Sequence, residues 1–317
     1  MKAIKLASVF AVSAVAAAVS TSTFAAEPVF SGEAGIEYTS YYGNADKNKG
    51  DEADGTDIGE LELAVDTGVI YAEIEVETTG ADEGTNVNFE QLYVKQGALS
   101  FGRFDGSVST GAFFGMDEIG KSGVDLNTGQ STKGDTDSTG VRYKVLPGLT
   151  VALEATEATN DTTNSDLQKD SQVGVALSYI ADLEGVKLGI SGGAIDDANA
   201  VNVGAQFNAG PATISLNYGV GETGTKTATT TTSDVEEVGF GIEFAATEAL
   251  TLTLQYAKNL EQSAADKAAG LSDDGTYFIA AYKAGDLTYY FENYNGDIDY
   301  SDGKGTEKNI IGVKASF

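Results

Sequence analysis

From residue 28 onward, apolar and polar side chains alternate in one segment of about ten residues after another. An alternation with a period of two is typical of β-strands whose two faces meet different surroundings. In one segment the apolar members are Val173, Val175, Leu177 and Tyr179. The pattern predicts sixteen strands, at residues 28–38, 58–66, 69–78, 87–96, 98–105, 138–145, 148–157, 171–180, 184–192, 199–208, 211–219, 235–245, 249–259, 275–284, 286–294 and 307–317.

The connections between these segments alternate in length. The short ones are residues 66–68, 96–97, 146–148, 181–183, 209–211, 245–248 and 284–286. The long, polar ones are residues 39–57, 79–86, 106–137, 158–170, 193–198, 220–234, 260–274 and 295–306. Outer-membrane barrels have short periplasmic turns and long extracellular loops, whereas a secreted β-sandwich or β-solenoid ordinarily has irregular connection lengths. We therefore predict an all-β fold, a sixteen-stranded antiparallel transmembrane β-barrel.

The residue types that the chain lacks limit its chemistry. It has no His and no Cys, which excludes Ser/His/Asp triads, thiol nucleophiles and the usual zinc and haem sites. It has 48 acidic and 19 basic residues and a formal charge of −29, so it lacks the basic surface that nucleic acids require. We therefore expect cations and not nucleic acid as partners, no catalytic residues, no cofactor and no bound metal.

Residues 1–25 have the three parts of a secretory signal peptide. The start is basic, with Lys2 and Lys5, the middle is apolar, and the end at Ala25 consists of small residues. A transmembrane anchor is the alternative, but the apolar run is shorter than the roughly 20 residues that a spanning helix needs. We predict cleavage after Ala25, which leaves residues 26–317 as the outer-membrane β-barrel domain.

Three features of the chain resemble the general porins of Gram-negative bacteria, which are sixteen-stranded trimeric diffusion channels. Residues 101–106 enter the longest loop, residues 141–145 leave it, and an alternating strand ends at Phe317. The resemblance covers nearly all of residues 26–317. It implies a homotrimer in the cell outer membrane, contacts with outer-membrane lipid and lipopolysaccharide, passive diffusion of ions and small hydrophilic solutes, and a role for Phe317 as the signal for barrel assembly.

The same resemblance implies that the third long loop, residues 106–137, folds into the barrel and narrows it. A loop of this length usually has a function of its own. In the family, acidic residues of this loop face basic residues of the barrel wall. The candidates here are the acids Asp117 and Glu118, ahead of Asp125, and the basic residues Arg103, Arg142 and Lys144.

Strand alternation decides which way these basic side chains point. Arg142 and Lys144 alternate with apolar residues that face lipid, so both turn into the lumen. Arg103 has the parity of the lipid-facing Phe101, where a charge costs about 2–4 kcal/mol at the bilayer midplane. We therefore expect the strand to bulge or to end before Arg103, so that this side chain turns inward.

Seven glutamates fall on the inward faces of the first three predicted strands: Glu33, Glu37, Glu60, Glu62, Glu73, Glu75 and Glu77. General porins commonly have basic residues on this wall, so the chain departs from the family pattern here. Carboxylates gathered in one region raise the local concentration of cations and repel anions, within a Debye length of about 8 Å at physiological salt. We predict a pore that prefers cations.

Three other functions are compatible with such a barrel. A substrate-selective channel, for oligosaccharides as an example, needs aromatic residues along the lumen, and the candidates are Tyr282, Tyr290 and Tyr294. A non-conducting adhesin or structural barrel has a blocked bore. An outer-membrane hydrolase would have to use a carboxylate or a Lys as its base.

Two short motifs are less specific. Gly219, Gly221 and Gly224 match the pattern GxGxxG, but no helix is expected after them, so we place them at the start of a long loop. The acidic residues between 297 and 307 have nearly the spacing of a calcium loop, with one residue too many. We expect these acids to bridge loosely through divalent ions to lipopolysaccharide phosphates.

Overall fold

The computed structural model describes residues 29–42, 51–52, 58–78, 85–111, 114, 116, 119, 122–126, 138–155, 172–223, 233–262, 267–268, 270–296 and 307–317. Within these ranges, no helix is both long enough and apolar enough to cross a membrane. The predicted signal peptide, residues 1–25, lies outside them. So do Asp117, Glu118 and most of the acidic segment before Glu307.

Sixteen long strands form one antiparallel sheet. They are β1 (Val29–Tyr41), β3 (Ile58–Asp66), β4 (Ile70–Thr78), β5 (Thr85–Gln96), β6 (Leu99–Phe104), β7 (Ser138–Leu146), β8 (Leu149–Ala155), β9 (Val173–Leu183), β10 (Val186–Ile195), β11 (Ala198–Ala209), β12 (Ala212–Thr223), β13 (Ser233–Ala245), β14 (Leu250–Asn259), β15 (Asp274–Ala284), β16 (Leu287–Gly296) and β17 (Lys308–Ser316). The short β2 (Asp51–Glu52) pairs with residues 38–39 of β1, next to the part of β1 that pairs with β3. It is therefore an interrupted continuation of β3.

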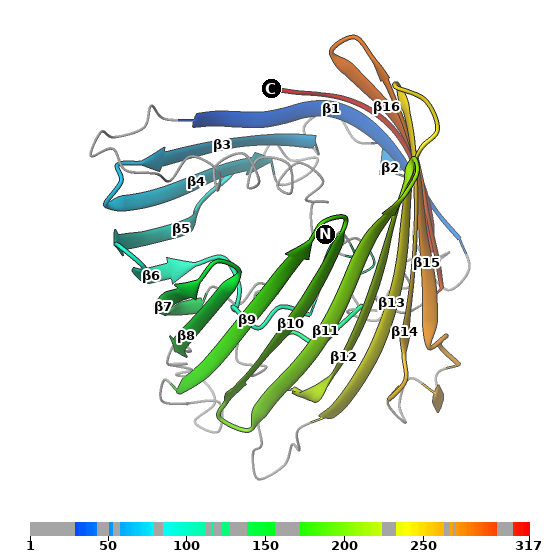
Figure 1. The fold of residues 1–317 in the computed structure, drawn as a ribbon. Coiled ribbons are helices and arrows are strands. Elements are labelled where there is room, and N and C mark those ends of the chain that lie inside the picture. The colour runs from blue at the N-terminus through cyan, green and yellow to red at the C-terminus, as the bar shows by residue number, and fades with distance from the viewer. Residues whose placement is uncertain are drawn as a thin grey trace, which may run out of the picture.

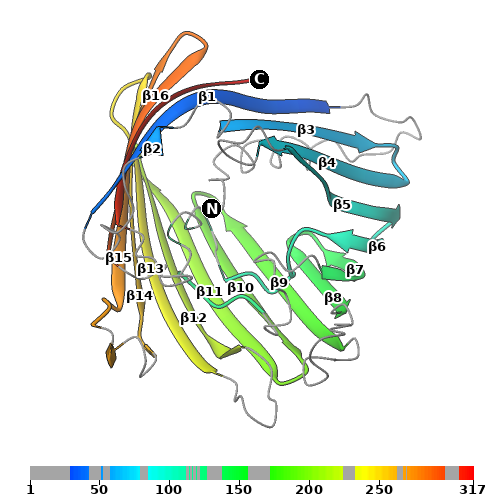
Figure 2. The ribbon, with the colours of Figure 1, turned by 180° about the vertical axis from the view of Figure 1, so that it is seen from behind.

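The sheet closes on itself. Each long strand pairs with the next along the chain, and β1 pairs with β17 from Glu33 opposite Ser316 to Tyr41 opposite Lys308. Gly32 and Phe317 exchange backbone hydrogen bonds of 3.2 and 3.0 Å at the end of this seam. Figure 1 and Figure 2 show the two terminal strands side by side. Because closure leaves no unpaired edge, this sheet satisfies the condition for crossing hydrocarbon. The predicted sixteen-stranded barrel is confirmed.

The period of two separates the two faces of the wall. Large apolar side chains such as Ile36, Leu177 and Phe291 are exposed on the outer face, while their strand neighbours Glu33, Ala176 and Glu292 are buried on the inner face. An exposed apolar outer surface is what lipid requires of a membrane barrel. Most strand ends lie within three residues of the predicted positions.

One predicted connection is wrong, and a second begins later than predicted. The long loop expected at residues 193–198 is a tight turn, because Ile195 pairs with Ala198 and only Asp196 and Asp197 lie between β10 and β11. Asp196 has φ = 53°, a conformation that Asp tolerates better than most residues. The loop expected from residue 220 begins later, since β12 continues to Thr223. Glycines that looked like loop residues therefore belong to strands.

Candidate functional site

The loop between β6 and β7 crosses the inner wall of the barrel. Ser191 Oγ of β10 donates a hydrogen bond to the Thr110 carbonyl (2.6 Å), and Ser215 Oγ of β12 donates one to the Phe114 carbonyl (2.7 Å). Farther along, the Ile119 amide donates to Gln255 Oε1 of β14 (3.3 Å). The outgoing arm of the loop therefore lies across β10 to β14, on the side that faces the lumen.

The loop then turns back along the same wall. Ser122 Oγ donates to the Met116 carbonyl (2.8 Å), which joins the returning arm to the outgoing arm. The amide side chain of Asn202 on β11 accepts from the Val124 amide and donates to the Val124 carbonyl, both at 2.8 Å. The described part of the loop is thus a hairpin held flat against the wall by side chains of several strands.

Two apolar contacts strengthen this attachment. Ile119 packs into a buried cluster whose other members are Ala257, Tyr277, Ile279, Tyr290 and Ile310. Val108 and Leu126 pack with a second set, Ala152, Ala176, Ile195 and Ala198. Burying an Ile or Leu side chain contributes about 1.5–3 kcal/mol. The loop is consequently part of the packed wall and not a free strap in the bore.

The residues that receive the loop were not among those predicted from the sequence. They are small or carry amide and hydroxyl groups: Ala176, Ser191, Gly193, Asn202, Ser215, Gly219, Gly239, Gly241 and Gln255. The opposite faces of the same strands carry Val, Leu and Tyr. This contrast between large outward and small inward residues was the available signal, because water alone does not require small side chains.

Arg142 lies inward, as its parity predicts, and contacts the first residues of the loop. Its Nη2 donates to the Gly106 carbonyl (2.6 Å), and its guanidinium lies 4.0 Å from the ring centre of Phe104. It is 3.9 Å from Glu154 Oε1. Glu154, which sequence analysis missed, is buried and accepts from Ser107 Oγ (2.5 Å) and the Val108 amide (2.7 Å). Both charges are used to hold the base of the loop.

The other predicted constriction residues have different positions. Lys144 is exposed close to the β7–β8 turn. Arg103 is half-buried and lies opposite the outward Leu92 in an uninterrupted β5–β6 register. The strand does not end before Arg103, and the register shifts lie between β4 and β5 and between β7 and β8 instead. The only irregularity beside Arg103 within β6 is Gly102, with φ = 145°. Asp125 is exposed and accepts from the Gly111 amide (2.7 Å).

The wall from β1 to β5 has a different lining, rich in carboxylates. Glu37 accepts from Tyr290 Oη (2.9 Å) and Glu62 from Ser31 Oγ (3.1 Å). Glu73 accepts from Gln91 Nε2 (2.9 Å) and Tyr71 Oη (3.0 Å). These donors are neutral, so the hydrogen bonds fix the carboxylates without cancelling their charge.

Several of the acids face one another across strands. Glu62 is directly opposite Glu75, and Glu60 is opposite both Glu33 and Glu77 in the backbone register. The side chains of Glu60 and Glu77 lie outside the described residues. Like charges directly opposite each other destabilise a sheet. Water and cations in a bore screen this repulsion between the carboxylates.

Three inward cations are already matched by acids. Lys314 Nζ is 2.8 Å from Glu33, Lys95 Nζ is 2.5 Å from Asp66, and Arg142 is close to Glu154. Glu37, Glu62 and Glu73 instead accept hydrogen bonds from neutral donors and keep their charge. The wall that the loop does not cover is therefore negative.

The aromatic candidates for a sugar path do not line the bore together. Tyr282 lies opposite Leu250 and Tyr289 and is 51% exposed on the outer face. Tyr290 is buried in the same cluster as Ile119, and Tyr294 packs against that cluster, with its ring centre 4.6 Å from that of Tyr277. A continuous aromatic track through these residues is therefore absent.

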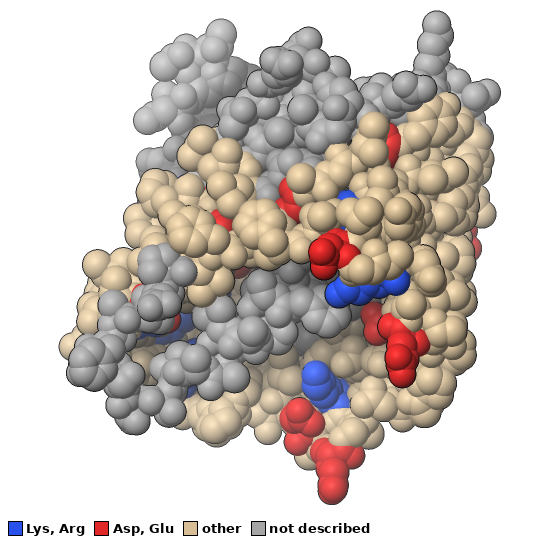
Figure 3. Space-filling model, turned by 90° about the horizontal axis from the view of Figure 1, so that it is seen from above, with Lys and Arg blue, Asp and Glu red and all other residues tan. Residues whose placement is uncertain are grey.

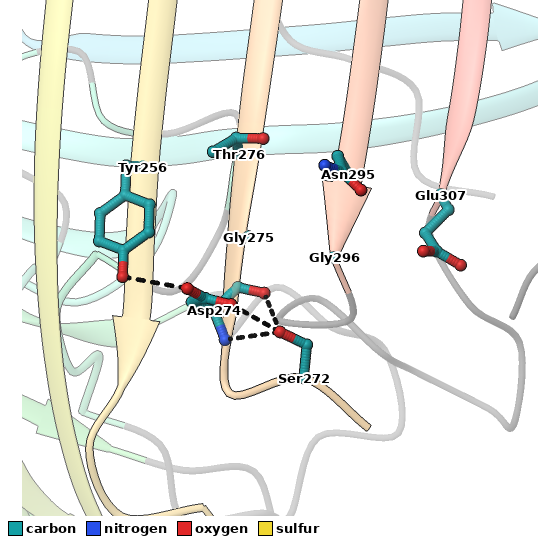
Figure 4. Close-up of a pocket in the computed structure, with 8 residues that line it drawn as sticks. All are labelled: Tyr256, Ser272, Asp274, Gly275, Thr276, Asn295, Gly296 and Glu307. Atoms are coloured by element: carbon teal, nitrogen blue, oxygen red, sulfur yellow. Dashed lines mark hydrogen bonds between the residues drawn. The ribbon is translucent and has the colours of Figure 1, made fainter. Parts of the chain in front are cut away.

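A small cavity of about 310 Å³ lies at the loop end of β14 to β17 (Figure 4). In it, Asp274 accepts hydrogen bonds from Tyr256 Oη (3.2 Å) and Ser272 Oγ (2.6 Å). Tyr256 and Thr276 are opposite each other and alternate with the inward Gln255 and Tyr277. This cavity is consequently on the outside of the barrel and does not contribute to the bore.

The described residues contain no group of three or more acidic side chains placed to hold a metal ion. Seen from above, acidic and basic side chains lie next to one another on the described surface of the barrel (Figure 3).

No protein-family model and no curated protein matches the sequence. Many solved structures are similar, among them the following three. OmpT of Vibrio cholerae, an outer membrane protein in trimer form, is 16% identical, with a TM-score of 0.59 over 93% of this chain and 99% of that one. The anion-selective porin of Comamonas acidovorans is 14% identical (TM-score 0.58; 92% and 99% covered). OmpF of Salmonella typhi is also 14% identical, with a TM-score of 0.58 over 92% of this chain and 97% of that one. The chain therefore has the fold of the sixteen-stranded outer-membrane porins.

Proposed function

We propose that the protein is an outer-membrane channel through which ions and small hydrophilic solutes diffuse passively, with a preference for cations. The observation that carries this proposal is the division of the inner wall. The loop covers the part from β8 to β14 and joins a buried cluster that extends to β17, while the part from β1 to β5 carries Glu33, Glu37, Glu62, Glu73 and Glu75. A solute that passes the loop must pass these carboxylates.

The preference follows from electrostatics at short range. Carboxylates in a narrow bore with low-dielectric walls raise the local concentration of cations and lower that of anions. The effect extends over about 8 Å at physiological salt, so it acts across a constriction but not across bulk water. An anion-selective porin has the same fold, which means that the lining, and not the barrel, must determine the sign of selectivity.

The cellular setting belongs to the same proposal. A signal peptide cleaved after Ala25 would deliver residues 26–317 to the outer membrane, where outer-membrane lipid and lipopolysaccharide would surround the barrel. A homotrimer is supported by the trimer form described for the similar OmpT. Phe317 would act as the assembly signal, and Asp117 and Glu118 would complete the constriction. No enzymatic activity is part of this proposal.

Neutralising the acidic wall tests the cation preference. In the variant E62Q/E73Q/E75Q, we expect the ratio of cation to anion permeability to fall several-fold, because three carboxylates leave the bore while the amides retain their size. The measurement is the reversal potential of refolded single channels in a potassium chloride gradient.

The matched control is Glu184→Gln, which removes one charge at the turn between β9 and β10. It should leave the reversal potential unchanged. An unaltered reversal potential in the triple variant would remove the acidic wall from the selectivity mechanism. A wild-type barrel that folds but conducts no current would contradict the channel proposal itself.

A further inference from the structure

We propose that Gly239 and Gly241 of β13 set the size limit of the pore, because they let Met116 sit against the wall and thereby hold the middle of the loop out of the bore. This inference rests on the proposed channel function. It concerns solute size, however, and is independent of the cation preference.

The contact between the loop and these glycines leaves no room for a side chain. A Cβ atom at Gly241 would lie 2.5 Å from Met116 Sδ, and one at Gly239 would lie 2.7 Å from Met116 Cε and 2.5 Å from Ser122 Cβ. Met116 is fully buried. Real Cβ atoms do not approach other atoms this closely, so a larger residue at Gly241 must push the Met116 side chain off the wall. A larger residue at Gly239 must also displace the loop itself, because its Cβ atom would lie 3.1 Å from Ser122 Cα.

The position of Gly241 in the sheet explains why it matters. Gly241 lies between Ser215 on β12 and Gln255 on β14 in the register. Ser215 bonds the Phe114 carbonyl and Gln255 bonds the Ile119 amide. The loop is therefore fixed on both sides of Met116. Gly241 lies between Ser215 and Gln255, and the space left by its missing side chain is filled by Met116.

The returning arm is seated in the same way. A Cβ atom at Gly219 of β12 would lie 2.5 Å from the Val124 amide nitrogen, and one at Gly193 of β10 would lie 2.8 Å from Leu126 Cδ2. Because glycines on three strands have no side chain, both arms of the hairpin can lie close to the backbone of the wall. Close approach of another backbone is a common reason for glycine within a strand.

The consequence for the bore is geometric. The loop hairpin forms one side of the passage, and the acidic wall from β1 to β5 forms another. With Phe114 and Ile119 anchored, a side chain added at Gly241 must move the Met116 side chain away from β13, and one added at Gly239 must also move the loop at Ser122, in both cases toward the passage. Cores and packed layers respond to added volume by such displacements. The free width then decreases while the charges of the acidic wall remain.

The test measures entry of neutral sugars of increasing size into proteoliposomes, by the rate of swelling. In Gly241→Val, we expect swelling with sucrose and raffinose to fall several-fold relative to wild type, with a smaller decrease for arabinose. The double variant G241V/M116A removes the displaced side chain and should recover most of the sucrose rate. Gly192→Val, on the outer face of β10, is the matched control and should leave the sugar rates unchanged.

Heat-dependent mobility in detergent gels identifies folded barrels before each measurement. If Gly241→Val does not fold, Gly239→Ala gives a smaller displacement and is expected to lower the sucrose rate in the same direction. Folded variants that retain the wild-type order of sugar rates, or a double variant that recovers nothing, would overturn the inference. A wild-type protein that admits neither ions nor sugars would instead overturn the proposed channel function.

Discussion

Replacing Lys314 with methionine is expected to lower the free energy of unfolding of the barrel by about 3 kcal/mol, because it leaves a buried carboxylate without its partner. Lys314 Nζ lies 2.8 Å from Glu33 Oε2, and the two side chains are only 15% and 6% exposed. The pair joins β17 to β1, at the seam where the barrel closes. Its loss therefore weakens the strand pair on which closure depends.

Unfolding in urea, followed by circular dichroism of the detergent-solubilised barrel, measures this effect. The double variant E33Q/K314M should recover much of the loss, since neither partner is then charged. Lys258→Met is the matched control, because Lys258 and Asp273 are 35% and 43% exposed and an exposed pair contributes about 0–1 kcal/mol. Equal stability of Lys314→Met and Lys258→Met would show that the seam pair is not a buried ion pair in solution.

The inward direction of both side chains of this pair could be predicted from the sequence. The alternation on β1 and β17 places both Glu33 and Lys314 on the inward face, because a period of two fixes the face of every residue in a strand. Their contact could not be predicted in the same way. It joins residues 281 positions apart and depends on the register of the closing strands, which the hydrophobic pattern of either strand alone does not determine.

The third loop was harder to predict for a different reason. It has no periodic pattern, so its path is determined by the wall that it contacts. Gly193 and Gly219 looked like loop residues because glycine often marks a turn. They belong to strands instead, where the absence of a side chain admits Leu126 and Val124. Glu154 was missed because a single acid on an inward face looks like ordinary lumen lining, until its contacts with the loop are known.

The proposed constriction acids remain predictions, because Asp117 and Glu118 lie outside the described residues. Their neighbours are nevertheless placed. Met116 and Ile119 are both buried against the inner wall, so the chain between them starts and ends at β13 to β15. The resemblance to porins predicted the loop's general course, while the residues that hold it could be identified only from the packed structure.

Releasing the tip of this loop should have the second large effect. In Ile119→Asp, a carboxylate replaces a side chain that is 3% exposed and packed among Tyr277, Tyr290 and Ile310. Glu292, itself buried, lies opposite Ile310 in the register, so the new charge would be close to an existing carboxylate. Burying an unpaired charge costs more than the apolar contacts of one Ile can offset. We therefore expect the tip to leave the wall.

Trypsin digestion of the folded barrel measures that release. Lys121 lies between Ile119 and Ser122, which are both buried in the wild-type protein, and proteases cut segments that open locally. We expect cleavage after Lys121, identified by mass spectrometry, to be at least about tenfold faster in Ile119→Asp, since a loss of about 1.4 kcal/mol in local stability gives this factor when opening is in equilibrium. Single-channel currents should fluctuate more, because the loop tip then moves within the bore. Ile119→Val keeps the apolar contact and should be cut at nearly the wild-type rate. Equal cleavage rates in Ile119→Asp and Ile119→Val would mean that the wall contacts of Ile119 do not hold the loop. The hydrogen bonds between the loop and Ser191, Ser215 and Asn202 would then be sufficient to hold it.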